Sequence, residues 1–187
     1  MFTYTTSELV RANIPYRKEI SDRLSYYTDI WLTINEMRRS IKFKVDTGSP
    51  YTIIGIDSLK KNGIKIDNKI LKKLNITNLN DASGNIVSIV PYKVDDFQLT
   101  DDISFEKIKI YLSSDITDRA VLGMDILSLF DFQYKQEKGN MLGTFWINNY
   151  KEHLKKINNI LKKKNLDYLD TEQIFLLDEF ENEEPKK

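Results

Sequence analysis

Residues 43–54 read Phe-Lys-Val-Asp-Thr-Gly-Ser-Pro-Tyr-Thr-Ile-Ile, and this stretch decides the fold. Its centre is Asp46-Thr47-Gly48, a tight glycine turn between two apolar runs that are typical of strands. One strand would deliver the Asp46 carboxylate to the tip of the turn, and a second strand would leave it. That arrangement suits a carboxylate that activates water. The same triplet also makes ordinary β-turns, so the rest of the chain must decide.

The composition is that of a soluble globular protein with one domain and extensions. The chain has 187 residues, of which 41% are apolar and 30% are charged. Lys and Arg balance Asp and Glu at 28 each, so no net field favours nucleic acid or an anionic membrane. The sequence has no cysteine, no apolar run long enough to span a bilayer and no signal-peptide pattern at its start. We therefore expect a cytoplasmic protein with no integral membrane segment.

The scarcity of histidine narrows the possible chemistry. His153 is the single histidine, and its Lys-rich helical surroundings predict a surface position. With one histidine and no cysteine, a Ser–His–Asp triad, a Cys–His pair and a zinc site are all poorly supported. Carboxylates or hydroxyls would have to carry any catalysis, and no metal or other cofactor is expected.

Alternating apolar residues predict a mostly β domain around the turn. Two strands of a hairpin, joined by a turn at residues 35–39, carry their inward residues at Ile30, Leu32, Ile34, Ile41, Phe43 and Val45. A short buried strand follows at residues 52–54, and a helical turn at 57–62 ends at Gly63. Residues 64–80 are ambiguous. Frequent turns between short strands are typical of a barrel or a closed sandwich.

Further strands follow a second turn cluster. Residues 81–85 predict a hairpin tip, and strand patterns follow over 86–99 and 105–112. Val121-Leu122-Gly123 combines a short strand with a glycine that lets backbones approach closely, and Asp125 is expected to cap a short helix over 126–130. Two closing strands are expected around 132–134 and 142–147.

The two ends differ in composition from the middle. Residues 1–22 are polar and mixed, which predicts an N-terminal arm. Residues 150–187 predict a helical C-terminal extension with a first helix bearing Leu154, Ile157 and Leu161, a second helix over 171–180, and a disordered acidic tail. The basic first helix suits either a membrane surface or packing on the domain or a partner chain, and we favour packing. The domain between the two ends would occupy residues 23–149.

The pairing of two motifs resembles the retropepsin-like aspartic protease family, in a cellular or bacterial-type member. The first motif is the strand–Asp46-Thr47-Gly48-Ser49–strand unit, and the second is the apolar–Gly123-Met124-Asp125–short-helix unit. The hairpin at Ser83-Gly84 falls between them, where the family carries its flap. The resemblance covers about residues 26–148. It implies a mostly β fold, a closed β-barrel of the retropepsin-like type with one short helix after the second motif and the C-terminal helical extension.

The resemblance also implies roles for named residues. Asp46 would be the catalytic carboxylate, Thr47 would brace the partner loop, Gly48 would let the backbone approach, and Ser49 would help to hold the carboxylate plane. Leu122, Gly123 and Asp125 would support the loop from the second motif. The flap residues Ala82, Ser83, Gly84 and Asn85 would close over an extended polypeptide substrate and pair with its backbone.

One carboxylate cannot both take a proton from water and donate one to the scissile amide, so this chemistry needs two. Two carboxylates about 4 Å apart repel by roughly 4 kcal/mol at an effective dielectric of about 20, so the pair retains one proton. The sequence has a single Asp-Thr-Gly and no Asp-Ser-Gly, and Asp81 begins a segment that is one residue too long to be a copy. A second molecule must supply the partner carboxylate, most simply in a homodimer.

The chain departs from the viral members in three places. Met124 stands where viral members usually carry arginine, the flap tip has only Gly84, and residues 64–80 are longer than in the smallest viral members. The leading hypothesis is a homodimeric aspartic endopeptidase. The alternatives are a catalytically silent retropepsin-like domain that binds peptides or dimerises, and an unrelated β domain in which the triplet is only a turn.

Overall fold

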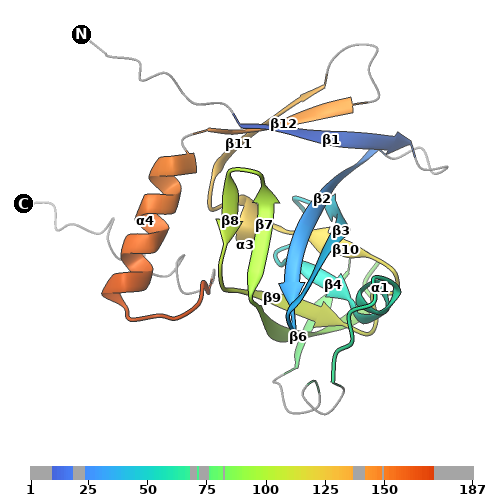
Figure 1. Ribbon diagram of the computed structural model, residues 1–187. Helices are drawn as coiled ribbons and strands as arrows, with labels where there is room; N and C mark the ends of the chain where they lie inside the picture. The colour runs from blue at the N-terminus through green and yellow to red at the C-terminus, as the bar shows by residue number, and fades with distance from the viewer. Residues whose placement is uncertain are drawn as a thin grey trace, which may run out of the picture.

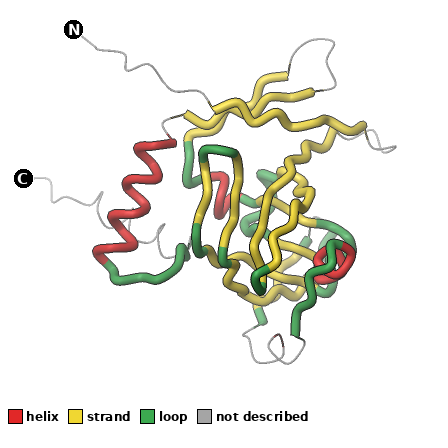
Figure 2. Tube along the Cα trace, viewed as in Figure 1, coloured by secondary structure: helices red, strands yellow, loops and turns green. Residues whose placement is uncertain are grey.

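We analysed a computed structural model of the chain, which describes residues 10–18, 24–67, 71, 76–81, 83–136, 142–148 and 150–170. Figure 1 shows a mostly β molecule, and helices form a small part of it (Figure 2). The helices are α1 (Ile56–Lys61), α3 (Met124–Leu127) and α4 (Tyr150–Lys163). The strands are β1 (Val10–Lys18), β2 (Leu24–Ile34), β3 (Met37–Val45), β4 (Ile53–Gly55), β5 (Thr77–Asn80), β6 (Ile86–Val94), β7 (Asp96–Thr100), β8 (Ile103–Phe105), β9 (Ile108–Ser113), β10 (Ala120–Leu122), β11 (Asp131–Gln136) and β12 (Leu142–Asn148).

The strands form one sheet that is not closed into a barrel, which corrects one part of the expected fold. The order is β11-β12-β1-β2-β3-β10-β4-β9-β6-β5, and β7 branches from β2 with β8 beside it. Among the described strands, no ladder joins β11 to β5. The two ends of the strand order, β11 and β5, therefore do not meet. β5 pairs with residues 86–89 of β6, and β7 joins the sheet at residues 31–33 of β2. The mostly β class and the single short helix after Gly123 are confirmed.

The β2–β3 hairpin is the framework of the fold, as its alternation predicted. Its register pairs Ile34 with Met37 across a two-residue turn. The turn residues Asn35 and Glu36 have positive φ angles of 50° and 65°, as the tight turn that matches strand twist requires. The inward residues Ile30, Leu32, Ile34, Ile41, Phe43 and Val45 are all buried. Burying such side chains contributes about 1.5–3 kcal/mol each before entropy is counted.

The β7–β8 hairpin covers the inner face of β2 and β3. Phe97 on β7 meets Phe43 edge-on at a ring separation of 6.0 Å and lies 6.5 Å from Phe105 on β8. Phe105 in turn lies 6.1 Å from Phe130, which follows α3. This line of aromatic rings joins the hairpin to the segment after the second motif, so one hydrophobic core supports both.

Two predicted strands are interrupted. The pattern over 86–99 breaks at the exposed Asp95, where β6 ends and β7 turns toward β2; the Asp95 backbone N–H donates to the Thr33 carbonyl at 3.0 Å. The pattern over 105–112 breaks at Glu106 and Lys107. At both breaks the spacing of the buried residues changes from two to three, from Val94 to Phe97 and from Phe105 to Ile108, so the alternation shifts by one residue where each strand ends.

Both predicted extensions contact the sheet. β1, within the predicted N-terminal arm, pairs with β12 along Val10–Pro15 and with β2 at its other end. In α4, the predicted stripe packs against the core, with Ile157 buried and Leu154 and Leu161 partly buried; Ile160, which the prediction did not include, is also buried. His153 is half-buried and meets Phe130 edge-on at 6.1 Å, so the prediction of a surface histidine was wrong. The predicted second helix over 171–180 and the tail lie outside the described residues.

The segment after α4 is fixed to β9. Leu169 forms a parallel bridge with Ile108, through hydrogen bonds of 2.7 and 2.8 Å to Lys107 and Lys109. Asp170 makes an ion pair of 2.8 Å with Lys109, and both side chains are nearly buried. The described part of the extension, residues 150–170, is therefore attached to the sheet.

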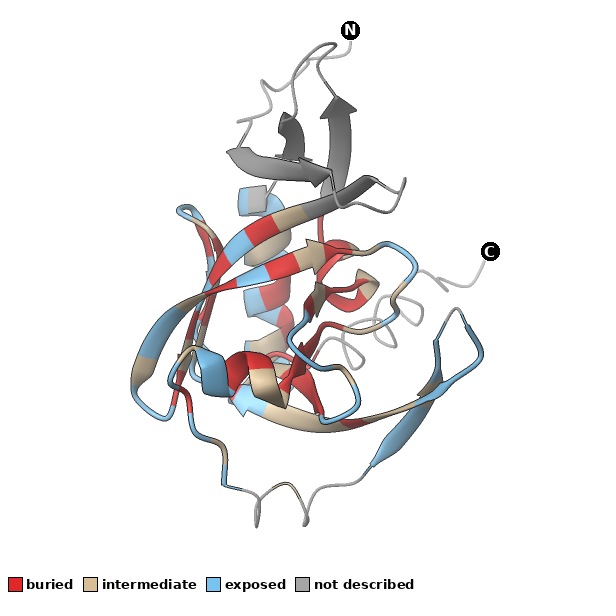
Figure 3. Ribbon diagram, turned by 90° about the vertical axis from the view of Figure 1, so that its right-hand side faces the viewer, coloured by how far each residue is buried: buried red, intermediate tan, exposed pale blue. Residues whose placement is uncertain are grey.

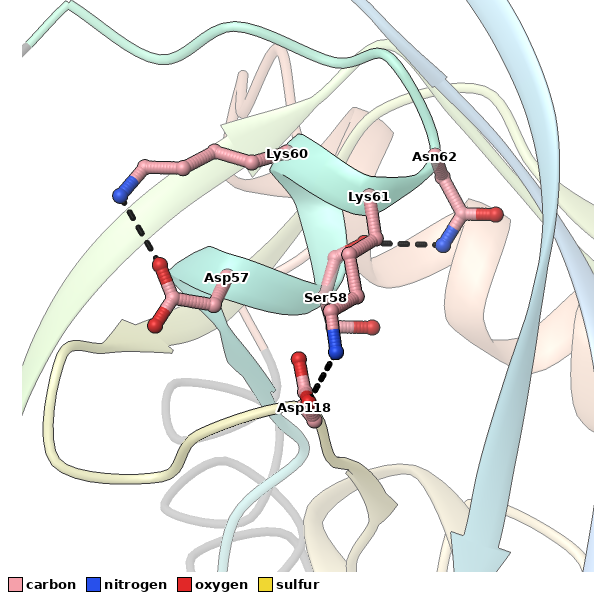
Figure 4. Close-up of polar contacts among 6 residues, drawn as sticks. All are labelled: Asp57, Ser58, Lys60, Lys61, Asn62 and Asp118. Atoms are coloured by element: carbon pink, nitrogen blue, oxygen red, sulfur yellow. Dashed lines mark hydrogen bonds and ion pairs between the residues drawn. The ribbon is translucent and has the colours of Figure 1, made fainter.

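The small helix α1 carries exposed ion pairs, which Figure 4 shows together with its C-terminal cap. Asp57 pairs with Lys60 at 2.9 Å, and Lys61 pairs with Asp118 from the loop before β10. The side-chain amide of Asn62 donates to the Ser58 carbonyl at 2.8 Å. These ion pairs are exposed, and such pairs contribute about 0–1 kcal/mol each.

Candidate active site

Asp46 lies at the end of β3, in a turn whose hydrogen bonds fix its carboxylate. The Gly48 backbone N–H donates to Asp46 Oδ1 at 3.0 Å, and the Ser49 N–H donates to the Asp46 carbonyl at 3.1 Å. The Asp46 side chain is 35% exposed. The turn that the sequence predicted is therefore present, and it holds one carboxylate oxygen while the group remains accessible to a substrate.

The second motif packs directly against this turn. β10 runs parallel to β3, with Val121 opposite Lys44 and Leu122 opposite Val45. The Leu122 carbonyl accepts the Asp46 N–H at 3.0 Å, so Leu122 contacts the Asp46 loop directly. Two segments that are about 75 residues apart in the chain thus form one unit.

Gly123 allows this close approach. A Cβ at Gly123 would overlap the Tyr51 carbonyl and lie 3.0 Å from the Ser49 carbonyl oxygen. The Met124 N–H then donates to that same Ser49 oxygen at 2.8 Å, and the Asp125 N–H donates to the Pro50 carbonyl at 3.1 Å. The N–H groups at the beginning of α3 therefore donate to the carbonyls of the Asp46 loop, across the close approach that Gly123 allows.

A buried polar pair ties the end of the loop to α3. Thr52 Oγ1 donates to Asp125 Oδ1 at 2.7 Å and accepts the Gly123 N–H at 3.0 Å. Asp125 Oδ1 also accepts the Ile126 N–H at 2.9 Å. Asp125 was expected to cap a helix over 126–130, but α3 begins at Met124 with Gly123 at the cap, and Asp125 lies in the first turn. The sequence analysis placed Thr52 in a buried strand, and its side chain is fully buried, but the bond from Thr52 to Asp125 was not predicted.

The remaining loop residues differ in their surroundings. Thr47 is exposed at the tip, with its side chain available to a partner. The Ser49 hydroxyl donates to the Tyr51 carbonyl at 2.8 Å, so in this structure it braces the loop and does not bind the carboxylate. The Gly48 backbone N–H takes the contact to the carboxylate that was expected of Ser49.

The predicted flap is an exposed hairpin formed by β5 and β6, which Figure 3 shows projecting from the body of the molecule. At its tip, Asp81 Oδ1 accepts the backbone N–H groups of Ser83 and Asn85, each at 2.8 Å. The Asn85 side chain donates to Asp81 Oδ2 at 3.0 Å, and this bond is the main reason that the pKa of Asp81 lies below its usual 3.8. Gly84 has a φ of 82°. Ala82 lies outside the described residues.

The structure brings the Asp46 turn and the flap to one cavity of about 330 Å³. The lining is mainly apolar, apart from two carboxylates at Asp46 and Asp81, and it comprises Asp46, Gly48, Ser49, Pro50, Ile53, Leu79, Asn80, Asp81, Val87, Ile116 and Val121. A cavity that is mostly apolar, with few polar groups and one held carboxylate, suits an extended peptide.

A cation also stands beside the carboxylate. Lys44 Nζ lies 3.4 Å from Asp46 Oδ2. The sequence analysis had placed Lys44 only as an outward residue of a solvated strand face. Its neighbour across the ladder, Val121, lines the cavity, so Lys44 lies on the same side of the sheet as the cavity.

A second cavity among the described residues is less suited to acid–base catalysis by the Asp46 carboxylate. A cavity of about 400 Å³ lies between α4 and the β8–β9 turn, and Asp46 is not part of its lining. Within the described ranges, no group of three or more His, Cys, Asp or Glu residues could hold a metal ion. In the same residues, no helix is both long and apolar enough to cross a membrane.

Comparison with known proteins adds a family to this geometry. The chain is similar to a solved structure, that of a retropepsin-like aspartic protease from Rickettsia conorii, with 20% identity and a TM-score of 0.46, over 79% of this chain and 98% of that chain. No curated protein matches the chain significantly. The family model described as aspartyl protease matches residues 30–126, just over half of the chain, and spans the Asp46 turn, the flap and the second motif. The chain therefore belongs to the aspartyl protease family, as its two motifs had indicated.

Proposed function

We propose that the protein is an aspartic endopeptidase that acts as a homodimer, in which each protomer contributes Asp46. The observation that carries this proposal is the Asp46 carboxylate, held by the Gly48 N–H at one wall of the cavity beneath the flap. The family membership supports a peptidase in general. The need for two carboxylates, set against one Asp-Thr-Gly in the sequence, supports the dimer.

The proposed reaction divides the work between the two carboxylates. The ionised Asp46 takes a proton from water as the water oxygen bonds to the scissile carbonyl carbon. The protonated Asp46 of the partner subunit gives its proton to the carbonyl oxygen. When the tetrahedral diol collapses, the C–N bond breaks and the amine nitrogen leaves with the proton held by Asp46. As the carboxyl C=O forms, one diol hydroxyl gives its proton to the partner subunit's Asp46, so the pair is again singly protonated.

The surrounding residues would serve this step by position. The buried contacts from Leu122, Gly123 and Asp125 fix the loop, because a carboxylate that moves by about 1 Å loses much of its catalytic advantage. Thr47, exposed at the loop tip, would reach the partner loop. The flap, comprising Asp81 to Asn85, would close over the bound peptide and exclude water.

We also propose limits for the catalytic domain and a cellular location for the protein. We place the catalytic unit at residues 23–149, supported by the 1–22 arm and the 150–187 extension. The absence of cysteine from the sequence fits a reducing compartment such as the cytoplasm.

The test is digestion of a diverse peptide pool by wild type and Asp46→Asn from about pH 4 to 7, with products read by mass spectrometry. Asp46→Asn is expected to lower cleavage about 1000-fold or more, because it removes the group that accepts the proton. Asp57→Asn is the matched control, since it removes an exposed carboxylate that pairs with Lys60 on α1 (Figure 4).

A mixing experiment tests the shared site. Adding an excess of Asp46→Asn chains to wild type should inhibit cleavage, because mixed dimers have one catalytic carboxylate. Full activity in the mixture, with subunit exchange shown by mass spectrometry, would overturn the shared site. Absence of Asp46-dependent cleavage by a confirmed dimer would favour the silent binding or dimerisation module.

A further inference from the structure

Lys44 lies where a substrate would meet the catalytic groups. Its Nζ atom is 3.4 Å from Asp46 Oδ2, and its side chain remains 40% exposed. Its ladder partner Val121 lines the cavity, and paired residues project to the same face of a sheet. Lys44 is not part of the cavity lining, so the strand places a cation beside the Asp46 carboxylate at the margin of the cavity.

The contribution of this ion pair to folding is expected to be small. Both side chains are more than a third exposed, and pairs of this kind contribute at most about 1 kcal/mol. Lys42, two residues earlier on the same strand face, is exposed, which is the ordinary position for a strand lysine. Lys44 is thus a residue that can be replaced without loss of the fold, and its charge can be examined separately from stability.

The charges at the proposed dimer centre do not balance. Two Asp46 carboxylates that share a proton carry one negative charge together, whereas the two Lys44 side chains carry two positive charges. Counted over these four side chains alone, one positive charge is left beside the scissile bond for a ligand to neutralise; the Asp81 carboxylates, which line the same cavity, belong to the flap and are not part of this group. The ligand groups nearest to it are the side chains that flank the scissile bond, because that bond must lie within about 3.5 Å of the attacking water held by Asp46.

We propose that Lys44 determines specificity by selecting peptides with Asp or Glu immediately next to the scissile bond. This rests on the proposed homodimeric protease. The rest of the cavity restricts the acidic residue to that place: its walls are mainly apolar, and Asp81 in the flap repels an acidic side chain farther from the bond. The substrate class is therefore a polypeptide with one acidic residue at the bond and apolar residues beyond it.

The experiment uses pairs of peptides that differ only in Glu or Gln beside a bond that the wild-type full chain cuts. The wild type is expected to cleave the Glu peptide with a kcat/KM about tenfold higher, as partly desolvated ion pairs allow. Lys44→Met should bring the ratio to about one, and Lys44→Glu should favour a Lys peptide instead. The wild-type ratio should fall as salt rises from about 0.05 to 1 M, because salt screens the pair.

Lys42→Met is the matched control, since it removes the same charge from the same strand face. Four residues of strand separate Lys42 from Asp46, about 13 Å, which exceeds the Debye length of about 8 Å at physiological salt. Its Glu/Gln ratio should equal that of the wild type. Thermal melting and the oligomeric state of each variant exclude misfolding as the cause of a change.

Two results would overturn the proposal. One is a wild-type Glu/Gln ratio near one at a bond whose cleavage requires Asp46. The other is a preference for Glu that persists in Lys44→Met. Both leave the proposed protease intact, because both presuppose cleavage that depends on Asp46. If no peptide is cut in an Asp46-dependent manner, the proposed function itself fails, and the charge preference fails with it.

Discussion

The Asp46 loop and the flap form the same cavity, yet they are held in opposite ways. The loop is joined to the second motif by backbone hydrogen bonds to Leu122, Met124 and Asp125, and a buried side-chain pair closes it. Among its described residues, the flap tip is held by local bonds around Asp81, and its neighbours are exposed. Ile86, beside the tip, is 66% exposed.

In the proposed protease, the Asp46 loop must hold a fixed position and the flap must move. A group that transfers protons must keep its position, so it lies on a rigid, buried support. An element that admits a peptide and then covers it must open at low cost, so it makes few contacts with the body. The base of the flap is nevertheless anchored: the Ser88 N–H donates to Asp115 Oδ2 at 2.7 Å, and the Ser113 hydroxyl donates to the Ser88 carbonyl at 2.8 Å.

The largest difference in stability between loop and flap substitutions is expected at their glycines, Gly123 and Gly84. Gly123→Ala is expected to destabilise the protein by about 3 kcal/mol or more, because the new methyl group would overlap the Tyr51 carbonyl. Gly84→Ala at the flap tip is the control. A Cβ there meets nothing within 4 Å, so only the strain of the positive φ remains, about 1 kcal/mol. Urea denaturation measures both, and equal losses would contradict the rigid-loop, loose-flap description.

Asp125 tests the buried pair that closes the loop. Asp125→Ala is expected to cost about 2 kcal/mol, because the Thr52 hydroxyl and the Ile126 N–H lose a buried acceptor. Asp115→Ala is the control on the flap side, since Asp115 is an exposed carboxylate that also accepts a backbone N–H. Its loss should be smaller because water can replace it. A destabilisation of Asp115→Ala that matches Asp125→Ala would remove the distinction.

Asn85 gives the smallest expected effect, confined to the flap tip. Asn85→Ala should raise the pKa of Asp81 toward its usual 3.8, because the Asn85 side-chain bond is the largest cause of the lowering. A lowered carboxyl pKa stabilises the folded tip above pH 3.8, and this support is lost as the pH falls through the lowered value. NMR titration of Asp81 measures the shift. Unfolding of the whole protein by urea should not change, whereas a global change would show that the tip is coupled to the core.

Local patterns predicted the local structure. The alternation from Ile30 to Val45 predicted the β2–β3 hairpin, and the turn residues predicted the flap tip at Asp81. The glycine before Met124 predicted the close approach of the second motif, although the helix begins earlier than expected. These features depend on neighbouring residues, and neighbouring residues are what a sequence displays.

Long-range features could not be predicted in this way. Thr52 and Asp125 are 73 positions apart, and nothing in either neighbourhood indicates their bond. Lys44 looked like any outward strand lysine until the register placed it beside Val121 and Asp46. The open sheet and the strand around Pro15 depend on pairing with β12, which periodicity does not encode.

The pairing of β1 with β12 has a consequence for the order in which the chain can fold. Val10 is opposite Ile147, so β1 finds one of its two neighbours only after about 140 further residues have been synthesised. Until then one side of β1 has no partner, and closing so long a loop is slow. The β2–β3 hairpin can form early on the nascent chain, whereas the β1–β12 ladder can form only after the second motif has been translated.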